Sequence, residues 1–102
     1  MSFQNAEIKK KANVYFDGRV TSRSIVTAGG ETKSLGVMLP GTYTFNTGAP
    51  EIMELTEGAC RVKLSGHSEW TDYAAGQSFE VPGNSSFEIE VLAVLDYVCH
   101  FG

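Results

Sequence analysis

The sequence predicts an all-β fold, a single barrel or double-sheet jelly roll, and three observations lead to this prediction. Glycine and proline interrupt the 102-residue chain at short, nearly regular intervals, which is typical of turns between short strands. The segments between these breaks alternate apolar with polar residues, so that one face of each strand would be buried. No window shows the period of an amphipathic helix. A barrel or jelly roll is favoured because it protects the edges of the sheet.

The turns and strands can be followed in order along the chain. Gly29 and Gly30 predict a hairpin tip, because glycine accepts the positive φ that tight turns require. The pairs Pro40-Gly41 and Pro82-Gly83 predict turns in which proline sets φ and glycine follows. The clearest alternating strands cover residues 42–45, 60–64 and 87–91, and further breaks fall at Gly18, Gly48, Gly58, Gly66 and Gly76.

The domain organisation is simple. A chain of this length forms one domain with a core of its own. Residues 2–11 are polar and lack a helix cap, so we expect residues 1–12 to be a flexible N-terminal tail. Residues 13–102 are expected to form one β-barrel domain.

Charge and hydropathy exclude several classes of protein. The net charge of −4 argues against a protein that binds nucleic acids or anionic membranes, because such proteins have a positive electrostatic field. The longest apolar run, residues 91–95, falls far short of the roughly 18 residues needed to cross a bilayer. The N-terminal segment has no apolar region of the secretory kind. We therefore expect a cytoplasmic protein in which Cys60 and Cys99 are reduced and buried.

Two segments have the spacing of a known pair of motifs. In residues 41–58, Gly58 follows Glu51 by seven residues, and this segment resembles the first cupin motif. In residues 76–83, Gly76 precedes Pro82 by six residues, and this segment resembles the second cupin motif. The resemblance implies a single-domain cupin-type jelly-roll β-barrel, a fold whose interior can hold a small ligand.

The resemblance extends over nearly the whole chain from Asn13 onward. It is carried by residues 15–20, 36–38, 41–47, 50–58 and 81–85, in their order and spacing. On these segments the chain resembles the small single-domain cupin family of pyrimidine/purine nucleoside phosphorylases. The resemblance implies a homodimer with broad specificity. It would cleave purine and pyrimidine nucleosides with inorganic phosphate to free base and (deoxy)ribose 1-phosphate.

The sequence departs from the metal-binding cupins at the ligand positions. Phe45 and Thr47 stand where the histidines of the first motif would be, and Phe87 stands near that of the second. A phenyl ring has no lone pair for a metal, and one carboxylate alone makes a poor transition-metal site. His67 and His100 have no partner at ligand spacing. We therefore expect no metal and no cofactor, with phosphate as a co-substrate.

Period-two alternation in the cupin register aims four residues, Tyr43, Phe45, Met53 and Phe87, at the interior, where they are candidates for binding substrate. Aromatic rings stack on the π-face of any nucleobase, which suits a broad substrate range. Glu51 is the candidate catalytic residue, because a carboxylate beside the sugar stabilises its developing positive charge. The alternatives are core packing for the aromatic residues and a turn-stabilising hydrogen bond for Glu51.

Phosphate requires donors, and the sequence offers three candidates for that role. Arg19 and Arg23 are predicted to share one face of their strand, and the planar guanidinium suits phosphate. Ser85 follows the Pro82-Gly83 turn and would stand at the mouth of the barrel. Two alternatives to the enzyme are a non-enzymatic cupin that binds a small metabolite and a metal cupin with unusual ligands.

Overall fold

The computed structural model describes residues 2–101, and almost all of its regular structure is strand. A single 3-10 turn, η1, interrupts the strands near the start of the chain. In chain order the elements are β1 (Glu7–Ile8), β2 (Asn13–Tyr15), η1 (Phe16–Gly18), β3 (Val20–Val26), β4 (Thr32–Met38), β5 (Gly41–Asn46), β6 (Glu51–Leu64), β7 (Thr71–Ala74), β8 (Ser78–Val81) and β9 (Ser86–Phe101).

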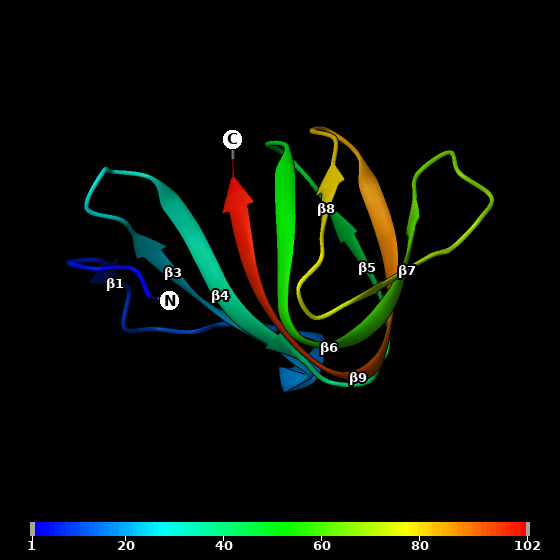
Figure 1. The fold of residues 1–102 in the computed structure, drawn as a ribbon, viewed down its shortest axis with the longest axis horizontal. Helices are drawn as coiled ribbons and strands as arrows, with labels where there is room; N and C mark the ends of the chain where they lie inside the picture. Colours follow the sequence, from blue (N-terminus) through cyan, green and yellow to red (C-terminus); the bar gives the residue numbers. More distant parts are fainter. Residues whose placement is uncertain (1, 102) are drawn as a thin grey trace.

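Two long antiparallel strands, β6 and β9, form the frame of the molecule (Figure 1). They pair from Glu51–Phe101 at one end to Leu64–Phe87 at the other, and both bend midway, so that the sheet folds into a U. The register shifts between Leu55 and Cys60 mark this bend. Gly58 lies in the bulge with φ +96°, and a Cβ there would overlap the carbonyl oxygen of Val94. The glycine expected to end a strand therefore bends one, because β-bulges increase local twist without ending the pairing.

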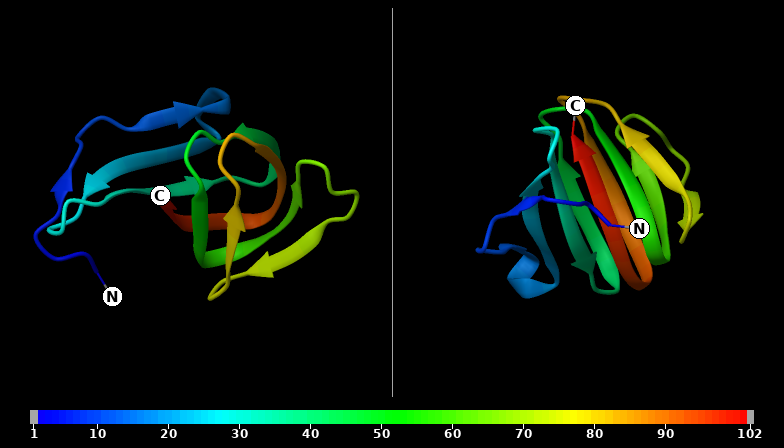
Figure 2. Two further views of the ribbon diagram at one scale, coloured as in Figure 1. Left: turned by 90° about the horizontal axis from the view of Figure 1, so that it is seen from above. Right: turned by 60° about the vertical axis from the view of Figure 1, so that its left-hand side comes forward.

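The remaining strands attach to the two arms of this U (Figure 2). On the first arm, the C-terminal half of β9 pairs with β4, which pairs with β3, while the N-terminal half of β6 pairs with β8. On the second arm, the N-terminal half of β9 pairs with β5 and the C-terminal half of β6 pairs with β7. The inner faces of both arms enclose the core. The expected all-β cupin-type jelly roll is confirmed.

The sheet is not closed into a continuous hydrogen-bonded barrel, and aromatic packing joins the two free edges instead. Phe16 of η1 packs 4.9 Å from Tyr43 and 5.5 Å from Phe45, measured between ring centroids. Tyr15 of β2 meets Phe45 edge-on at 6.4 Å. These contacts bring the β2 edge against β5, which lies on the other arm. Side chains therefore complete the enclosure that main-chain hydrogen bonds leave open.

The burial pattern confirms the predicted alternation. Tyr43, Met53 and Phe87 are at most 3% exposed and face the core, whereas Arg61 and Lys63 are on the outer face. The predicted turns at Gly29-Gly30 and Pro82-Gly83 lie between strands, and that at Pro40-Gly41 ends at the first residue of β5. Cys60 and Cys99 are free and buried, as expected. Among residues 2–101, no helix is long and apolar enough to cross a membrane.

The N-terminal segment follows the edge of β3. Glu7 and Ile8 pair with Val26 and Ile25, and the Lys9 amide donates to the Ser24 carbonyl at 2.9 Å. Part of the range 1–12 therefore has a strand pairing, while the flexibility of that tail stays a prediction. The outer limits of the two expected ranges, Met1 and Gly102, lie outside the described residues.

Candidate functional site

The inner face of the first arm carries a row of polar side chains where a core face is normally apolar. Ser24, Ser34 and Cys99 are directly opposite one another on β3, β4 and β9. In the next row, Ser22 lies two residues from Ser24 and hydrogen-bonds the Tyr97 hydroxyl. Cys99, Tyr97, Ser22 and Ser34 are each at most 8% exposed. Buried polar groups cost free energy unless they are paired, so their concentration on one face is notable.

Asn13 completes this row from the neighbouring edge strand. Its side-chain amide donates to the hydroxyl oxygens of Ser22 and Ser24, at 3.2 and 3.3 Å. Each serine that accepts from Asn13 keeps its own hydroxyl proton for another partner. We call Asn13, Ser22, Ser24, Ser34, Tyr97 and Cys99 the polar row.

Glu51 lies at the end of the polar row, at the open end of the U. It is half-buried at the start of β6, where it pairs with Phe101 and shares the inner face with buried Met53. Burial raises the pKa of the Glu51 carboxyl above its usual range, and a hydrogen bond with the Cys99 thiol partly opposes this shift. Burial, together with the neighbouring Glu51, raises the pKa of the Cys99 thiol to about 12, so Cys99 stays a neutral donor.

Aromatic rings stand beside the polar row. Phe45 stacks on Phe87 with ring centroids 5.6 Å apart and planes 28° from parallel. Tyr15, in edge contact with Phe45, is close enough to Tyr97 to raise the pKa of its phenol, although burial is the main cause of that increase. Glu51 contributes to the same shift. A carboxylate, hydroxyl groups and aromatic faces are thus gathered in one part of the interior.

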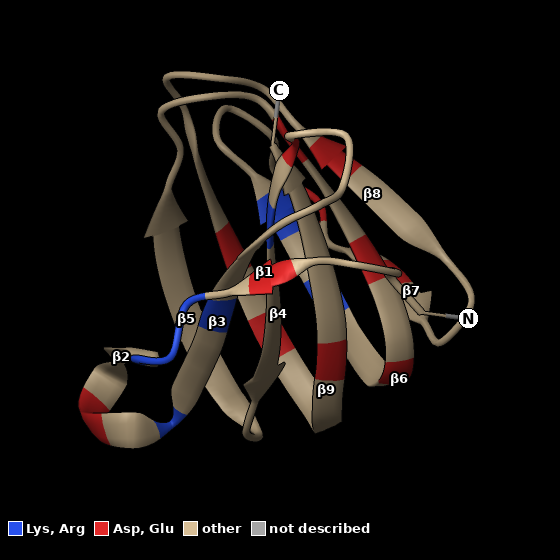
Figure 3. Ribbon diagram, turned by 90° about the vertical axis from the view of Figure 1, so that its left-hand side faces the viewer, with Lys and Arg blue, Asp and Glu red and all other residues tan. Residues whose placement is uncertain are grey.

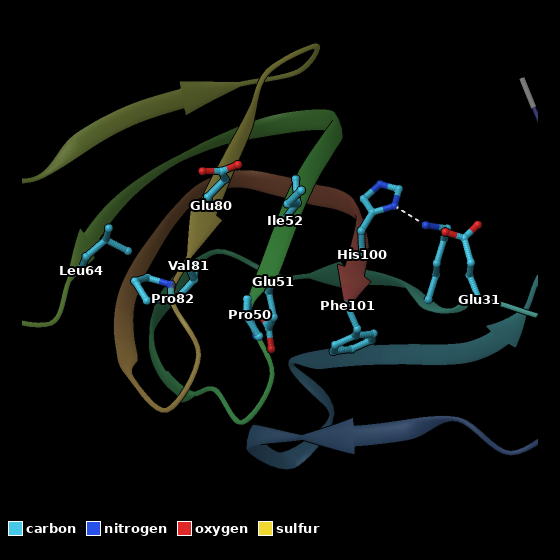
Figure 4. Close-up of a pocket in the computed structure, with 11 residues that line it drawn as sticks. Glu31, Pro50, Glu51, Ile52, Leu64, Glu80, Val81, Pro82, His100 and Phe101 are labelled. Carbon is cyan, nitrogen blue, oxygen red and sulfur yellow. Dashed lines mark hydrogen bonds between the residues drawn. The ribbon is translucent and has the colours of Figure 1, made fainter.

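The open end of the fold is hollowed around Glu51 (Figure 4). The hollow has a volume of about 800 Å³, enough for a molecule of nucleoside size. In the close-up, Glu51 and Phe101 extend toward the same side, while Ile52 and His100, each adjacent in sequence to one of them, extend the other way. The hollow therefore has an inner wall formed by Glu51 and an outer rim formed by the opposite face of the sheet.

His100 on this rim is held between two charged side chains. Lys33 Nζ lies 2.8 Å from His100 Nδ1, and His100 Nε2 lies 2.8 Å from Glu54 Oε1. The Lys33 ammonium can only donate, so His100 Nδ1 accepts its hydrogen bond. The ring proton is therefore on Nε2, which donates a hydrogen bond to the Glu54 carboxylate. Glu54 faces outward from β6, and His100 lies in β9, the last strand.

Three of the four predicted substrate-binding residues are within the core. Tyr43, Met53 and Phe87 are 2 or 3% exposed, whereas Phe45 is partly exposed. The Tyr43 hydroxyl donates to the Leu39 carbonyl at 2.6 Å, so that proton is already engaged.

The predicted phosphate residues are not brought together. Arg19 precedes Val20, which pairs with Met38 of β4, and Met38 in turn pairs with Leu95 of β9. Glu51 pairs with Phe101, six residues further along β9, which corresponds to about 20 Å of strand. The Arg19 guanidinium instead lies over the Tyr43 ring, 5.4 Å from its centroid.

Arg23 and Ser85 lie in two other places. Arg23 is exposed on the outer face of β3, away from the polar row. Ser85 is at the open end, where its amide donates to the Thr47 hydroxyl at 3.0 Å and its carbonyl accepts from the Thr47 amide. Thr47 also donates to the Pro82 carbonyl at 2.7 Å. This network holds the two loops beside Glu51 together.

The polar row was missed by sequence reasoning. Ser22 and Ser24 lie in the segment where Arg19 and Arg23 were the phosphate candidates, and Ser34 is one of several polar residues in its own segment. A signal does exist, because the alternation of β3 puts Ser22 and Ser24 on the same face as buried Val20. Within residues 2–101, no group of three or more His, Cys, Asp or Glu side chains is arranged to hold a metal ion.

Comparison with known proteins agrees with this fold. A protein from Thiobacillus denitrificans, named pyrimidine/purine nucleoside phosphorylase, is 64% identical over 101 residues, covering 98% of this chain and 97% of its own. A crystal structure of a protein of unknown function from Acinetobacter has a TM-score of 0.96 at 48% identity, covering 99% of this chain and 98% of its own. The EutQ protein of Clostridium difficile shares the fold alone, with a TM-score of 0.67 at 14% identity, covering 80% and 67%.

The model of one family matches residues 10–101, which is nearly the whole chain. Together with the relatives at about 60% identity, this match shows that the chain belongs to the pyrimidine/purine nucleoside phosphorylase family.

Proposed function

We propose that this protein is a metal-independent pentosyltransferase that cleaves purine and pyrimidine nucleosides with phosphate, yielding free base and (deoxy)ribose 1-phosphate. The observation that carries the proposal is the half-buried Glu51 carboxylate at the end of the polar row, on the inner face of the first arm, while the second arm carries the Phe45–Phe87 stack. A sugar suits the hydroxyls and carboxylate, and a base suits the aromatic faces.

In the proposed reaction, a phosphate oxygen attacks the anomeric carbon and the bond from that carbon to the base nitrogen breaks. The electron pair of that bond leaves with the base, which takes a proton from water. Positive charge develops on the sugar in the transition state, and Glu51 stabilises it. A carboxylate in a partly desolvated position is more effective at this task than one in water.

Phosphate is proposed to bind through uncharged donors at the open end. The hydroxyl proton of Ser24, which the Asn13 contact leaves available, and the hydroxyl of Ser85 are the candidates there. Lys10 and Lys11 add positive charge beside the β3 edge, because the Lys9 amide attaches this segment to Ser24. Arg19 and Arg23, which lie at the closed end and on the outer face, are then less suited to this role than their spacing predicted.

Broad specificity is proposed to follow from stacking on Phe45, since every base has a π-face. We also propose a homodimer, as the family resemblance implies. The metal-independent mechanism is supported by the donor set, because no three His, Cys, Asp or Glu side chains of the described residues are grouped to hold a metal ion.

The test is base release from inosine and uridine by purified protein, with and without phosphate. We expect release that requires phosphate. The Glu51→Gln variant should lower kcat by at least about 100-fold, which corresponds to loss of electrostatic stabilisation in the transition state. The matched control is Glu54→Gln on the outer face of the same strand, which should retain activity.

A folded Glu51→Gln variant with unchanged kcat would refute the role of Glu51. The second candidate, a metabolite-binding cupin without activity, is favoured if nucleosides raise the Tm of the wild-type protein and no base is released.

A further inference from the structure

The outer face of the first arm carries an apolar groove that is separate from the interior. Leu35 and Val37 of β4 are 37% and 38% exposed there, and Ile8 of β1 is 64% exposed. Together with Ile25 they line a hollow of about 380 Å³ between β1 and the sheet. Contiguous exposed apolar side chains on a sheet face are typical of a protein–protein contact.

Two opposite charges flank this groove. Arg23 of β3 and Asp96 of β9 both line it, both are exposed, and neither side chain forms an ion pair within residues 2–101. Figure 3 looks toward this side of the molecule and shows basic positions on β3 and acidic positions on β9. Charges on the outer face of the second arm differ, because Arg61 approaches Asp72 at 3.6 Å and Lys63 approaches Glu88 at 3.5 Å.

The register fixes where the two flanking charges lie relative to the apolar strip. Arg23 is opposite Leu35, and Asp96 is opposite Val37, on either side of β4. The line from Arg23 to Asp96 therefore crosses β4 between Leu35 and Val37. A two-fold axis lying in the contact plane, at right angles to that line, exchanges the Arg23 and Asp96 positions.

We propose that a second copy of this chain docks on this face. Arg23 of each copy then meets Asp96 of the other, and Leu35 and Val37 of both copies pack together at the axis. An isologous contact of this kind forms both ion pairs from one patch, since the same surface serves both copies. The charges supply orientation and the apolar strip supplies most of the burial.

The homodimer is part of the proposed function, on which this inference rests, and the outer face of the first arm is inferred to be its contact surface. The contact uses the outward-facing residues of β3, β4 and β9, whereas Glu51 and the polar row face inward on the same arm. The interiors of both copies thus stay open. The experiment below measures mass alone, so its failure is distinguishable from a failure of the phosphorolysis proposal.

Charge reversal tests the contact. Arg23→Glu places Glu against Asp in both pairs, and Asp96→Arg places Arg against Arg, so each variant alone should be monomeric by light scattering after size-exclusion chromatography. We expect the dissociation constant of each to rise at least about 100-fold. An equimolar mixture of the two variants should form a heterodimer. In that heterodimer the two substituted positions face each other with opposite charges, and the second pair keeps its native Arg23 and Asp96.

The matched control is Arg61→Glu on the second arm, which should leave the dimer intact. Leu35→Lys provides a second variant, expected to be monomeric with an unchanged circular dichroism spectrum. A monomeric wild-type chain, single variants that still dimerise, or a mixture of the two reversals that stays monomeric would each overturn the proposal. Recovery of the dimer in the mixture also shows that both variants are folded.

Discussion

Phe45 and Phe87 stack across β5 and β9 with their ring centroids 5.6 Å apart, and they differ sharply in exposure. Phe87 is 3% exposed and belongs to the core, whereas Phe45 is only partly buried against it. Phe87 therefore packs against one face of the Phe45 ring from the core side. In the proposed function a base stacks on Phe45, whose ring is held in place by its buried neighbour.

Replacing Phe45 by leucine should weaken nucleoside binding more than it weakens the fold. Base stacking on an aromatic ring contributes about 1–3 kcal/mol, so we expect KM for the nucleoside to rise about tenfold. The increase should be similar for inosine and uridine, because stacking hardly distinguishes the bases. Steady-state kinetics with both substrates checks this expectation.

A matched control for that variant is Trp70→Leu, which removes an exposed aromatic ring packed over Lys63 outside the interior. Its kinetic constants should equal those of the wild type. A Phe45→Leu enzyme with unaltered KM for both nucleosides would remove Phe45 from the binding site.

The raised pKa of Glu51 predicts a specific dependence on pH. Because burial raises this pKa above 4.5, the folded protein binds the proton more tightly than the unfolded chain does. Ionised Glu51 therefore costs stability above the folded-state pKa, and this cost disappears as the pH falls below 4.5. Glu51→Gln should accordingly have a higher Tm than the wild type at neutral pH, with the difference vanishing in acid.

The same shift affects catalysis. If ionised Glu51 stabilises the transition state, kcat/KM should fall in acid through an apparent pKa above 4.5. Rate profiles and melting curves on the same buffers measure both effects. A Tm difference that grows toward low pH would contradict the assigned environment of Glu51.

Gly58 should be among the positions least tolerant of a side chain. Its φ of +96° is unfavourable for other residues, and a Cβ would overlap the Val94 carbonyl at the bend of the sheet. Gly58→Ala should lower the free energy of unfolding by about 3 kcal/mol or more. Urea denaturation followed by fluorescence measures this loss.

Gly66 is a matched control with the same sign of φ. Its φ is +81°, and a Cβ there would meet nothing within 4 Å. Gly66→Ala should cost only about 1 kcal/mol, from backbone strain alone. Equal losses for the two variants would show that crowding at the bend adds nothing.

Removal of divalent metal should leave the proposed activity unchanged. Among the described residues, Glu51 is not part of any group of three His, Cys, Asp or Glu side chains that could hold a metal ion, and one carboxylate alone makes a poor transition-metal site. We expect identical kcat/KM before and after dialysis against a chelator, with no gain on adding zinc. Loss of activity that zinc or iron restores would instead favour a metal cupin with unusual ligands.

Much of the fold was predictable from local patterns. The alternation in residues 42–45, 60–64 and 87–91 predicted which side chains face the core, and the structure confirms it. Turn residues predicted where the chain reverses. Gly58 shows the limit, because a glycine with positive φ ends a strand in one context and bends it in another. Only pairing with β9 on both sides of the bulge decides between them.

The candidate site divides in the same way. The resemblance to the cupin motifs singled out Glu51, and the inward orientation of Glu51, Phe45 and Phe87 followed from period-two alternation in the cupin register, which is a local property of the strand. The polar row did not follow from it, since Asn13, Ser22, Ser34 and Tyr97 come from four strands. Likewise, Arg19 and Arg23 suited phosphate by residue type, yet one stacks on Tyr43 and the other faces outward.

By itself, then, the sequence determined the all-β class, the facing of each main strand, the buried thiols and, through its motifs, the family. The tertiary structure alone decided which polar side chains meet around Glu51, which cations stay away from it, and where an unpaired Arg23 and Asp96 flank an apolar strip within residues 2–101. The physical reason is range. Alternation and turn chemistry act over a few neighbouring residues, whereas the register between β3, β4, β6 and β9 joins residues far apart in the chain, such as Lys33 and His100.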